Sequence, residues 1–528
     1  MIHKSPCPDV EIPAVPLHEF VLDALRAQGS RPAIIDGPTG RTLTAGQIVG
    51  AVERCAAGLA KRGLRKGDVL AILSPNLPEY AIVFLGVSRA GGVLTTMNPL
   101  YTAEEVTRQL KETGATLLVT VGPLLERAQE AARDTAVREI IVFGTADGAT
   151  PFAVLLAETG PAPVVPLSPD DLAVLPYSSG TSGIPKGVML THRNLVAQLC
   201  QAESTLPQYH EATVLALLPF FHIYGMVLIL LLGLRAGSGL VTLMRFELEP
   251  FLACIQKYRI TYAPLVPPIV LALAKHPVVD RYDLSSLQNI GSGAAPLGLE
   301  VEEACARRLN CKIFQGFGMT EFTGASITNL DAMGITRHGS VGVCWPNMEA
   351  RIVDTETGRD VGPGERGELW MRGPNVMKGY FNRPEATAEM LLPDGWLRTG
   401  DVAYVDADGF FFIVDRVKEL IKHNAYQIAP AELEAVLLSH AAVADAAVIP
   451  SPDEESGEVP KAFVVLKSPV STDEILDHVA RHVAPYKKIR RIEIVEAIPK
   501  SPSGKILRRV LIEREREAAN GGPGSTGG

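Results

Sequence analysis

The sequence predicts an α/β protein with a large N-terminal domain of layered α/β subdomains, a β-rich subdomain and a small α+β C-terminal domain. Three observations support this fold class. The chain has 528 residues, more than one compact core accommodates. Short apolar runs alternate with amphipathic helix patterns through much of the chain, and closely spaced short strand patterns begin after about residue 345.

The first α/β layer is expected from a regular series of strand and helix patterns. Residues 69–73 (VLAIL) are apolar throughout, as a strand covered on both faces by helices should be. A helix pattern follows at residues 78–90. Further strands are expected at residues 92–96, 117–120, 140–143 and 172–175. This alternation predicts a largely parallel sheet.

One apolar stretch needs a separate interpretation. Residues 214–234 contain no acid or base except His222, and their length would permit a membrane span. Pro219 and Gly225 interrupt the run, however. We therefore expect no membrane span but a buried strand, a turn and a buried helix. Their expected ranges are 213–218, 219–222 and 223–234.

The last third of the sequence changes character. Short strands separated by Gly, Pro and Asp turns are expected at residues 350–353, 367–372 and 409–414. A compact α+β pattern then follows, with a helix at 430–440 and strands at 441–449 and 461–466. We expect a domain of residues 1–416, a second domain of residues 417–516 and a Gly-rich, disordered tail of residues 517–528.

The overall composition excludes several classes of protein. The net charge of -9 argues against a nucleic-acid partner, because such proteins bind phosphates through basic surfaces. The seven cysteines are scattered and contain no CxxC pair, which favours free thiols over a metal or disulfide framework. The N-terminus has no apolar signal core and the C-terminus has no Ser-Lys-Leu signal, so we expect a cytoplasmic protein.

The most specific local pattern is a loop at residues 177–187 that follows an expected strand. It contains three hydroxyl side chains after Tyr177 and Ser178, two glycines, and then Pro185 and Lys186. Glycines allow backbone N–H groups to approach a phosphate, hydroxyls add donors and lysine supplies charge. The spacing differs from the Walker pattern, since the lysine comes later. The alternative is a flexible surface loop, but the packing of these residue types favours a polyphosphate site.

This loop and five further segments give a clear resemblance. In chain order the six motifs lie at residues 177–194, 219–222, 315–321, 395–401, 415–422 and 502–506. Together they resemble the adenylate-forming superfamily, which includes acyl-CoA synthetases, firefly luciferases and nonribosomal-peptide adenylation domains. The segments FHIY, GSGAAPLG and PKSPSGKILRR are most similar to 4-coumarate–CoA ligases.

The resemblance implies a reaction in two steps. A carboxylate attacks the α-phosphate of ATP and releases pyrophosphate, and a thiol then attacks the acyl adenylate and releases AMP. The expected small molecules are a carboxylic acid, ATP, Mg²⁺ and coenzyme A. The resemblance also implies that the C-terminal domain is mobile and rotates about Lys418 between the two steps.

The resemblance assigns roles to individual residues. Lys505 should reach the carboxylate and α-phosphate, Glu321 should bind Mg²⁺, and His222 should border the acid. Phe317 should stack on adenine, and Asp401 should accept both ribose hydroxyls. The expected catalytic residues are Lys505, His222, Thr181 and Glu321. The expected nucleotide-binding residues are Ser178, Ser179, Gly180, Thr181, Ser182, Lys186, Gln315, Gly316, Phe317, Gly318, Thr320, Asp401, Arg416, Lys418, Lys422, Gln427 and Lys505. The expected acid-binding residues are Tyr224, Val227, Leu228, Gly291, Ala294, Gly316, Gly324 and Ala325, and the expected CoA-binding residues are Arg245, Asn424 and Ala425.

Two departures from the family pattern bear on specificity. Asn424 and Ala425 stand where close relatives carry lysine and glycine beside the CoA pantetheine, so we expect weaker CoA binding or another acceptor. Leu228 stands where hydroxycinnamate ligases carry a serine that helps to bind the ring hydroxyl, and Gly291 replaces a frequent lysine. A site without a hydroxyl partner disfavours a buried hydroxyl, so we expect a less polar acid than caffeate.

We therefore predict an acyl- or aryl-CoA ligase acting on an aryl acid such as cinnamate or 4-coumarate. The alternatives are a ligase for medium-chain fatty acids and a stand-alone enzyme that loads the thiol of a carrier protein. A non-catalytic nucleotide-binding protein is disfavoured by the complete set of motif residues. A luciferase-type oxygenase remains an alternative by fold alone, and fold does not assign function.

Overall fold

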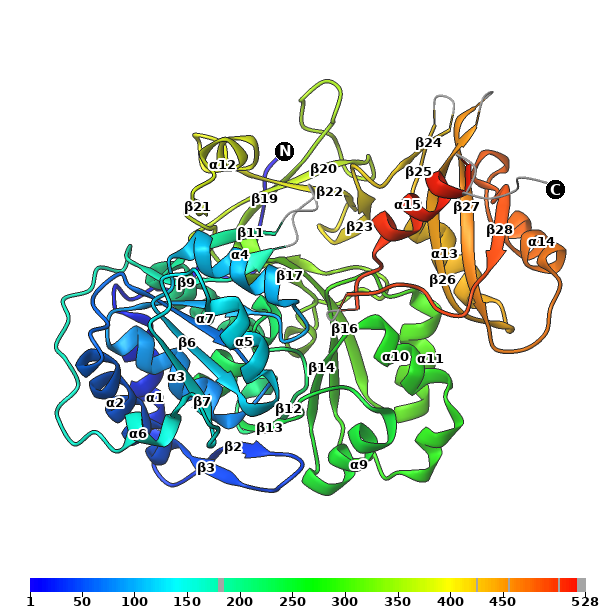
Figure 1. Ribbon diagram of the computed structural model, residues 1–528. Coiled ribbons are helices and arrows are strands. Elements are labelled where there is room, and N and C mark those ends of the chain that lie inside the picture. The colour runs from blue at the N-terminus through cyan, green and yellow to red at the C-terminus, as the bar shows by residue number, and fades with distance from the viewer. Residues whose placement is uncertain (179–184, 424–425, 454–455, 502–503, 520–528) are drawn as a thin grey trace, which may run out of the picture.

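A computed structural model describes residues 1–178, 185–423, 426–453, 456–501 and 504–519 of the chain. Within these residues the strands form four sheets. Figure 1 shows two large sheets with their helices in the N-terminal half, a smaller β-rich layer beside them, and a C-terminal α+β unit at one end. The expected mixed α/β fold class is therefore confirmed.

The first large sheet has nine described strands in the order β10-β11-β9-β5-β4-β6-β7-β8, with β21 paired to β11. Strands β4, β5, β6 and β7 run parallel, and every residue of the first three is buried. The strands are β4 (Val69–Leu73), β5 (Val93–Met97), β6 (Leu117–Val121), β7 (Glu139–Phe143), β8 (Thr150–Pro151), β9 (Leu172–Leu175), β10 (Tyr177–Ser178), β11 (Lys186–Thr191) and β21 (Gly379–Tyr380). The helices that precede, connect or follow them are α2 (Ala45–Lys61), α3 (Pro78–Arg89), α4 (Ala103–Thr113), α5 (Leu125–Ala132) and α6 (Phe152–Leu156). The apolar runs of the sequence thus correspond to strands covered by helices.

The second large sheet also has nine described strands, in the order β18-β17-β16-β15-β14-β12-β13-β2-β3. Its bounds are β2 (Pro32–Asp36), β3 (Thr42–Thr44), β12 (Thr213–Ala216), β13 (Gly239–Thr242), β14 (Tyr262–Leu265), β15 (Asn289–Ser292), β16 (Lys312–Met319), β17 (Gly324–Thr328) and β18 (Val343–Cys344). The helices are α1 (Leu17–Gln28), α7 (His192–Thr205), α9 (Leu248–Tyr258), α10 (Pro267–Lys275) and α11 (Leu299–Leu309). Strands β2 and β12 to β16 are parallel, so their carboxyl ends lie at one edge, where α/β proteins bind ligands.

The apolar stretch at residues 214–234 lies in the core. It forms β12, a π-helical segment η3 (Tyr224–Leu231) and helix α8 (Leu232–Ala236), so the expected strand, turn and helix are confirmed with one change. The first turns of the helix are π-helical, a wider form that is frequent at functional sites. A Cβ on Gly225 would lie 2.2 Å from the Pro219 carbonyl oxygen, so this residue must be glycine. Among the described residues, no helix is both long and apolar enough to cross a membrane.

The β-rich layer is an antiparallel sheet in the order β1-β19-β20-β22-β23. Its strands are β1 (His3–Lys4), β19 (Glu349–Val353), β20 (Gly367–Arg372), β22 (Leu397–Val405) and β23 (Phe411–Arg416), and helix α12 (Pro384–Met390) lies beside it. All three strands expected here are present, although the last of them, β23, starts two residues later than the expected range.

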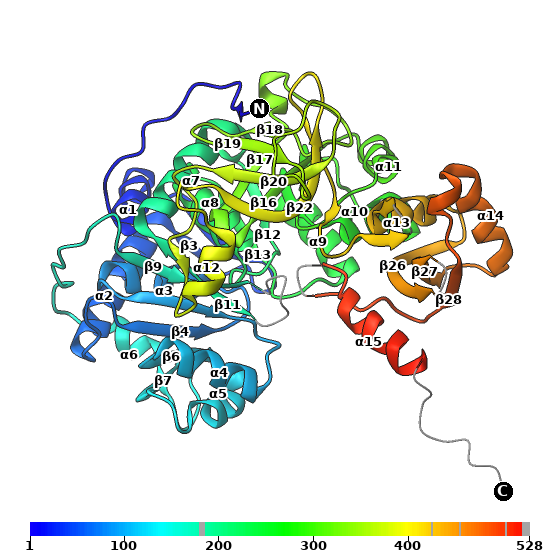
Figure 2. The same cartoon turned by 90° about the horizontal axis from the view of Figure 1, so that it is seen from above.

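The C-terminal unit contains a five-stranded sheet with helices packed against it (Figure 2). The strands are β24 (Ile421–His423), β25 (Tyr426–Ile428), β26 (Val443–Asp453), β27 (Gly457–Leu466) and β28 (Arg491–Ile494). The helices are α13 (Pro430–Ser439), α14 (Thr472–His482) and α15 (Arg508–Ala519). Between β28 and α15 the chain leaves this unit and extends to β16 of the second large sheet (Figure 1).

Candidate active site

A cavity lies at the carboxyl ends of β15 and β16, between η3 and β17. Lys505, from the segment between β28 and α15, also lines it. Twelve of the residues expected from the sequence line this cavity. They are His222, Tyr224, Leu228, Gly291, Ala294, Gly316, Phe317, Gly318, Thr320, Gly324, Ala325 and Lys505. Residues separated by almost 300 positions in the sequence therefore meet in one site.

A tight turn presents Lys505. The Ser501 N–H donates to the Lys505 carbonyl over 2.8 Å, and the Lys505 N–H donates to Ser501 Oγ over 3.1 Å. Gly504 occupies this turn with φ of +79°, and a Cβ there would lie 3.2 Å from Val266, the residue between β14 and α10. Burial and the neighbouring Arg416 charge lower the pKa of Lys505, whereas Asp401, Glu321 and Glu419 oppose this shift. The ammonium group is thus held in a site that contains both acidic and basic partners.

Glu321 is a buried carboxylate with an exposed fraction of 3%. Ser178 Oγ and Tyr380 Oη donate to its Oε1 atom over 2.9 and 2.8 Å. The Lys186 ammonium lies 5.0 Å from the centre of the Tyr380 ring. Burial and the Glu321 charge raise the pKa of Tyr380, so its hydroxyl remains a donor. Sequence reasoning did not single out Tyr380, because its neighbours on the chain carry no recognisable motif.

The environment of Glu321 fits a divalent cation. In the part of the chain that the structure describes, no basic side chain forms an ion pair with Glu321, and a buried carboxylate needs a compensating charge. No cluster of three or more His, Cys, Asp or Glu side chains there could hold a metal by itself. Mg²⁺ is commonly held by one or two carboxylates together with substrate phosphates and water, which matches a single buried glutamate.

Asp401 and Arg416 face each other on neighbouring strands. They are paired in register between β22 and β23, and Arg416 Nε lies 3.5 Å from Asp401 Oδ1. Burial raises the pKa of Asp401 to about 6, although the charges of Arg416 and Lys505 act in the opposite direction. A buried carboxylate beside a guanidinium suits the expected recognition of ribose hydroxyls.

The deeper part of the cavity is aromatic. Tyr209, Tyr262, Phe314 and Trp345 line it, and none of them was expected from the sequence. A Cβ on Gly291 would lie 2.5 Å from Tyr262 Oη, so the glycine makes room for this tyrosine. Trp345 Nε1 and Tyr209 Oη are buried without a hydrogen-bond partner in the described chain. The Tyr262 ring packs against that of Tyr209 at 4.8 Å. Burial, and to a smaller extent the neighbouring Tyr262, raises the pKa of Tyr209.

His222 lies at the junction between this aromatic part and Lys505. Burial and the Lys505 charge lower the pKa of His222 to about 4, so the ring is neutral near pH 7. Its Nδ1 atom accepts the Tyr224 N–H over 3.3 Å. Tyr224 Oη in turn donates to the Gly291 carbonyl over 3.3 Å. A neutral imidazole can border an organic acid without forming an ion pair with it.

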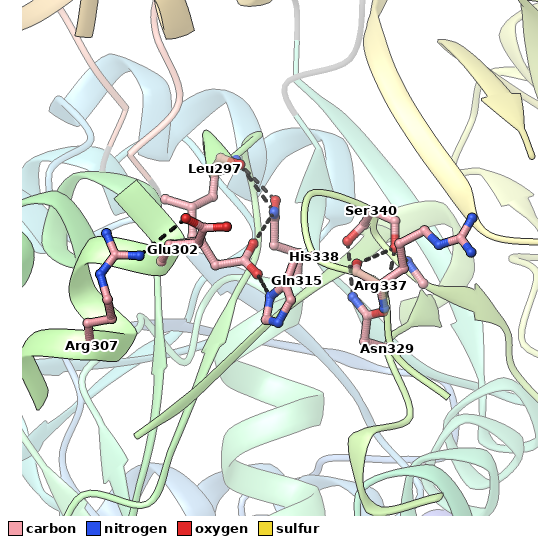
Figure 3. Close-up of polar contacts among 10 residues, drawn as sticks. Leu297, Glu302, Arg307, Gln315, Asn329, Arg337, His338 and Ser340 are labelled. Atoms are coloured by element: carbon pink, nitrogen blue, oxygen red, sulfur yellow. Dashed lines mark hydrogen bonds and ion pairs between the residues drawn. The ribbon is translucent and has the colours of Figure 1, made fainter. Parts of the chain in front are cut away.

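Gln315 belongs to a polar network with Leu297, Glu302 and His338 (Figure 3). Its side-chain amide donates to the Leu297 carbonyl and accepts the Leu297 N–H, each over 3.1 Å. The same amide donates to Glu302 Oε2 over 2.8 Å, and His338 Nδ1 lies 2.6 Å from Glu302 Oε1. The Gln315 side chain therefore holds the GSGAAPLG segment in place. Gln315 does not line the cavity, but the next residue on β16, Gly316, does.

Several expected residues are not brought to the cavity. Val227 is fully buried but does not belong to the described residues that line the cavity. Arg245 is 81% exposed and pairs with Glu247 over 2.5 Å, and Lys422 is exposed. Other expected residues also lie outside the lining, namely Ser178, Lys186, Gln315, Glu321, Asp401, Arg416 and Lys418. Ser179, Gly180, Thr181, Ser182, Asn424, Ala425 and the side chain of Gln427 fall outside the described residues.

These features define an enzyme that activates an organic acid with a nucleotide. Residues 22–381 match the AMP-binding enzyme family, and residues 432–505 match the AMP-binding enzyme C-terminal domain. The chain is 45% identical over 523 residues to a 4-coumarate–CoA ligase of Pinus taeda, an alignment that covers 97% of either protein. The chain belongs to the AMP-binding enzyme family and is an AMP-forming acid–CoA ligase of the 4-coumarate–CoA ligase-like group.

Two solved structures extend the comparison. The anthranilate CoA ligase AuaEII in complex with anthranoyl-AMP has a TM-score of 0.89 and 26% identity, over 97% of this chain and 99% of that chain. The amide bond synthetase McbA from Marinactinospora thermotolerans has a TM-score of 0.85 and 27% identity, over 94% of this chain and 100% of that chain. The expected resemblance is confirmed, and the same fold occurs in an enzyme named for amide rather than thioester formation.

Proposed function

We propose that this enzyme converts an aryl acid such as cinnamate or 4-coumarate to its CoA thioester through an acyl adenylate. The observation that supports this most directly is that Lys505 reaches the cavity that also contains Thr320, His222 and an aromatic recess. A flat aromatic acid in that recess would direct its carboxylate toward the lysine. The identity to 4-coumarate–CoA ligases over nearly the whole chain supports the same substrate class.

In the first step a carboxylate oxygen of the acid attacks the α-phosphate of ATP, and pyrophosphate leaves. Both reactants are anionic, so the Lys505 ammonium between them reduces their repulsion. Asp401 and Arg416 orient the ribose, and Lys186 meets the departing phosphates. Glu321 would hold Mg²⁺, which supplies positive charge to the phosphates when bound.

In the second step a thiolate attacks the acyl carbon and AMP leaves with the electrons of the broken acyl–oxygen bond. We propose CoA as the thiol donor. The alternative acceptor is the thiol of a carrier protein. The reason for it is that Asn424 and Ala425 stand where close relatives carry lysine and glycine. The structural likeness to an amide bond synthetase is a reason to test acceptors other than CoA as well.

The acid is proposed to be less polar than caffeate. Leu228 lines the cavity, and the Tyr224 hydroxyl proton is already donated to Gly291. The identity to 4-coumarate–CoA ligases keeps 4-coumarate beside cinnamate as a candidate. Medium-chain fatty acids stay an alternative, since the apolar walls of the cavity would also accept an alkyl chain.

The proposal is tested by pyrophosphate release with cinnamate, 4-coumarate, caffeate, benzoate and octanoate, with and without CoA. We expect multiple turnovers only with CoA, a thioester product, and loss of most of the release in Lys505→Ala, by about 100-fold or more. Release that stops near one equivalent with CoA present would favour a carrier protein. A preference of about tenfold or more for caffeate over cinnamate would contradict the proposed acid class.

A further inference from the structure

Two hydroxyl groups converge on one oxygen of the buried carboxylate. Ser178 Oγ and Tyr380 Oη donate to Glu321 Oε1 from different strands, β10 and β21. No hydrogen bond in the described chain reaches Glu321 Oε2 through a side chain. Among the described residues, the two oxygens of this carboxylate therefore differ in their surroundings, since two hydroxyls donate to Oε1 and no side chain donates to Oε2.

The backbone fixes Tyr380 where this contact requires it. Tyr380 pairs with Val188 of β11, and its N–H donates to Thr387 Oγ1 over 2.9 Å. The side chain is buried with 3% exposure. Because β11 begins at Lys186, the same strand pairing that holds Tyr380 also places the Lys186 ammonium 5.0 Å from its ring centre. One residue thus contacts both an anionic and a cationic group of the site.

The proton of the Tyr380 hydroxyl has two neighbouring acceptors. Met390 Sδ and Glu321 Oε1 both lie 2.8 Å from Tyr380 Oη. A carboxylate is a much stronger acceptor than a thioether, so the proton is directed to Glu321.

We propose that Tyr380 is a positioning residue for the metal and phosphate part of the site. Its hydroxyl, together with Ser178, fixes Glu321 so that Oε2 is the atom offered to a divalent cation. Its ring holds the Lys186 ammonium beside the phosphates through a cation–π contact. This inference rests on the proposed function, since it takes Glu321 and Lys186 as the groups that meet Mg²⁺ and ATP.

The test distinguishes the role of the Tyr380 hydroxyl from the role of its ring, in the full-length enzyme. ATP binding is measured by calorimetry without acid or thiol, once with a chelator and once with excess MgCl₂. Tyr380→Phe should leave metal-free ATP binding unchanged. The increase in ATP affinity that Mg²⁺ provides should be about tenfold smaller than in the wild type, because residues that hold a metal ligand in place contribute about that much to metal affinity. Tyr380→Leu should additionally weaken metal-free ATP binding about two- to fivefold.

Tyr258→Phe is a matched control. Its hydroxyl donates to the Gly37 carbonyl over 2.8 Å, and the Lys257 ammonium lies 4.6 Å from its ring centre, so it has the same two kinds of contact outside the cavity. This variant should bind ATP as the wild type does, with and without Mg²⁺. If Tyr380→Phe does not fold, the loss of the Mg²⁺ gain is measured in Tyr380→Leu, which removes the same hydroxyl.

The outcomes distinguish the inference from the proposed function. If the wild type binds ATP more tightly with Mg²⁺ and Tyr380→Phe shows the same gain, the role of Tyr380 is overturned while the ligase function stands. If the wild type binds no ATP under either condition, the proposed function fails. Loss of the Mg²⁺ gain in Tyr380→Phe, with metal-free binding kept, supports the inference.

Discussion

At the scale of single residues, the site depends on charged groups that have been moved out of water. Asp401 illustrates the consequence, since burial brings the pKa of this carboxyl group close to the physiological range. Arg416 and Lys505 act against this shift but do not cancel it. If Asp401 accepts the ribose hydroxyls as proposed, its protonation would decide whether they meet an ionised acceptor.

Asp401 gives a prediction about pH. With a pKa of about 6, the carboxyl group is ionised above that pH and protonated below it, so ATP recognition weakens as the pH falls. From pH 7 to pH 5 the ionised fraction falls about tenfold, and kcat/KM for ATP should fall with it. The measurement is kcat/KM for ATP in wild type and Asp401→Asn across this range, expressed as a ratio. The ratio removes the effect of the terminal phosphate of ATP, which titrates in the same range.

Asp401→Asn should be the weaker enzyme at pH 7 and should show a flatter profile. The ratio of the two kcat/KM values is expected to shrink as the pH falls. A ratio that stays constant from pH 7 to pH 5 would show that Asp401 does not titrate in the free enzyme.

At the scale of elements, buried histidines join helices of the N-terminal half. His192 is the first residue of α7, and its Nδ1 accepts the N–H of Leu17, the first residue of α1, over 3.2 Å. Its side chain is almost fully buried, with 1% exposure. Burial lowers the pKa of His192 to about 4, and the nearby Asp171 only partly opposes this. The contact between the two helices requires a neutral ring.

His192 gives a prediction about acid stability. Its pKa is about 6.5 in the unfolded chain and about 4 in the fold, so between these values the unfolded state binds more protons. The free energy of unfolding therefore falls as the pH decreases through this window. From pH 7 to pH 5 the loss due to His192 should be about 2 kcal/mol. Urea unfolding of wild type and His192→Gln at both pH values measures it.

The glutamine variant keeps a side-chain acceptor but cannot be protonated, so it should lose less stability between the two pH values. His210→Gln is the control, since His210 is exposed. It should have the same pH dependence as the wild type. An identical loss of stability in wild type and His192→Gln would contradict the prediction.

At the scale of the whole molecule, two hydrogen bonds join helix α13 of the C-terminal unit to residues before the expected hinge. Asp415 Oδ2 accepts the Ala431 N–H at the start of α13 over 2.9 Å, and Lys275 of α10 donates to the Leu438 carbonyl at its end over 3.0 Å. Asp415 and Lys275 both precede the expected hinge Lys418, whereas α13 follows it. Rotation about that hinge would have to break both contacts, which belong to the arrangement with Lys505 in the cavity.

Removing one of these contacts should affect the two half-reactions unequally. Asp415→Ala should slow formation of the acyl adenylate about five- to tenfold, because a typical hydrogen bond contributes about 1 kcal/mol. Thioester formation from supplied acyl adenylate should change less, since it does not need Lys505 in place. Rapid-quench measurement of each half-reaction tests this. Lys275→Met should act in the same direction, and equal slowing of both steps would argue against the idea.

The sequence by itself determined the features that depend on which residues follow one another along the chain. Apolar runs such as residues 69–73 became buried strands, because a strand covered on both faces leaves no polar position. The motif segments identified Lys505, Glu321 and Asp401 as a set, since their residue types and order recur together. These inferences needed no knowledge of which segments touch.

Only the tertiary structure decided the contacts between distant segments. It turned Val227 away from the cavity, because a π-helical segment spaces its side chains differently from the expected α-helix. It gave Glu321 its partner Tyr380, 59 residues away, and it placed Tyr262 over Gly291. Such contacts arise from the packing of whole layers against one another, and no local pattern in the sequence records which side chains that packing brings together.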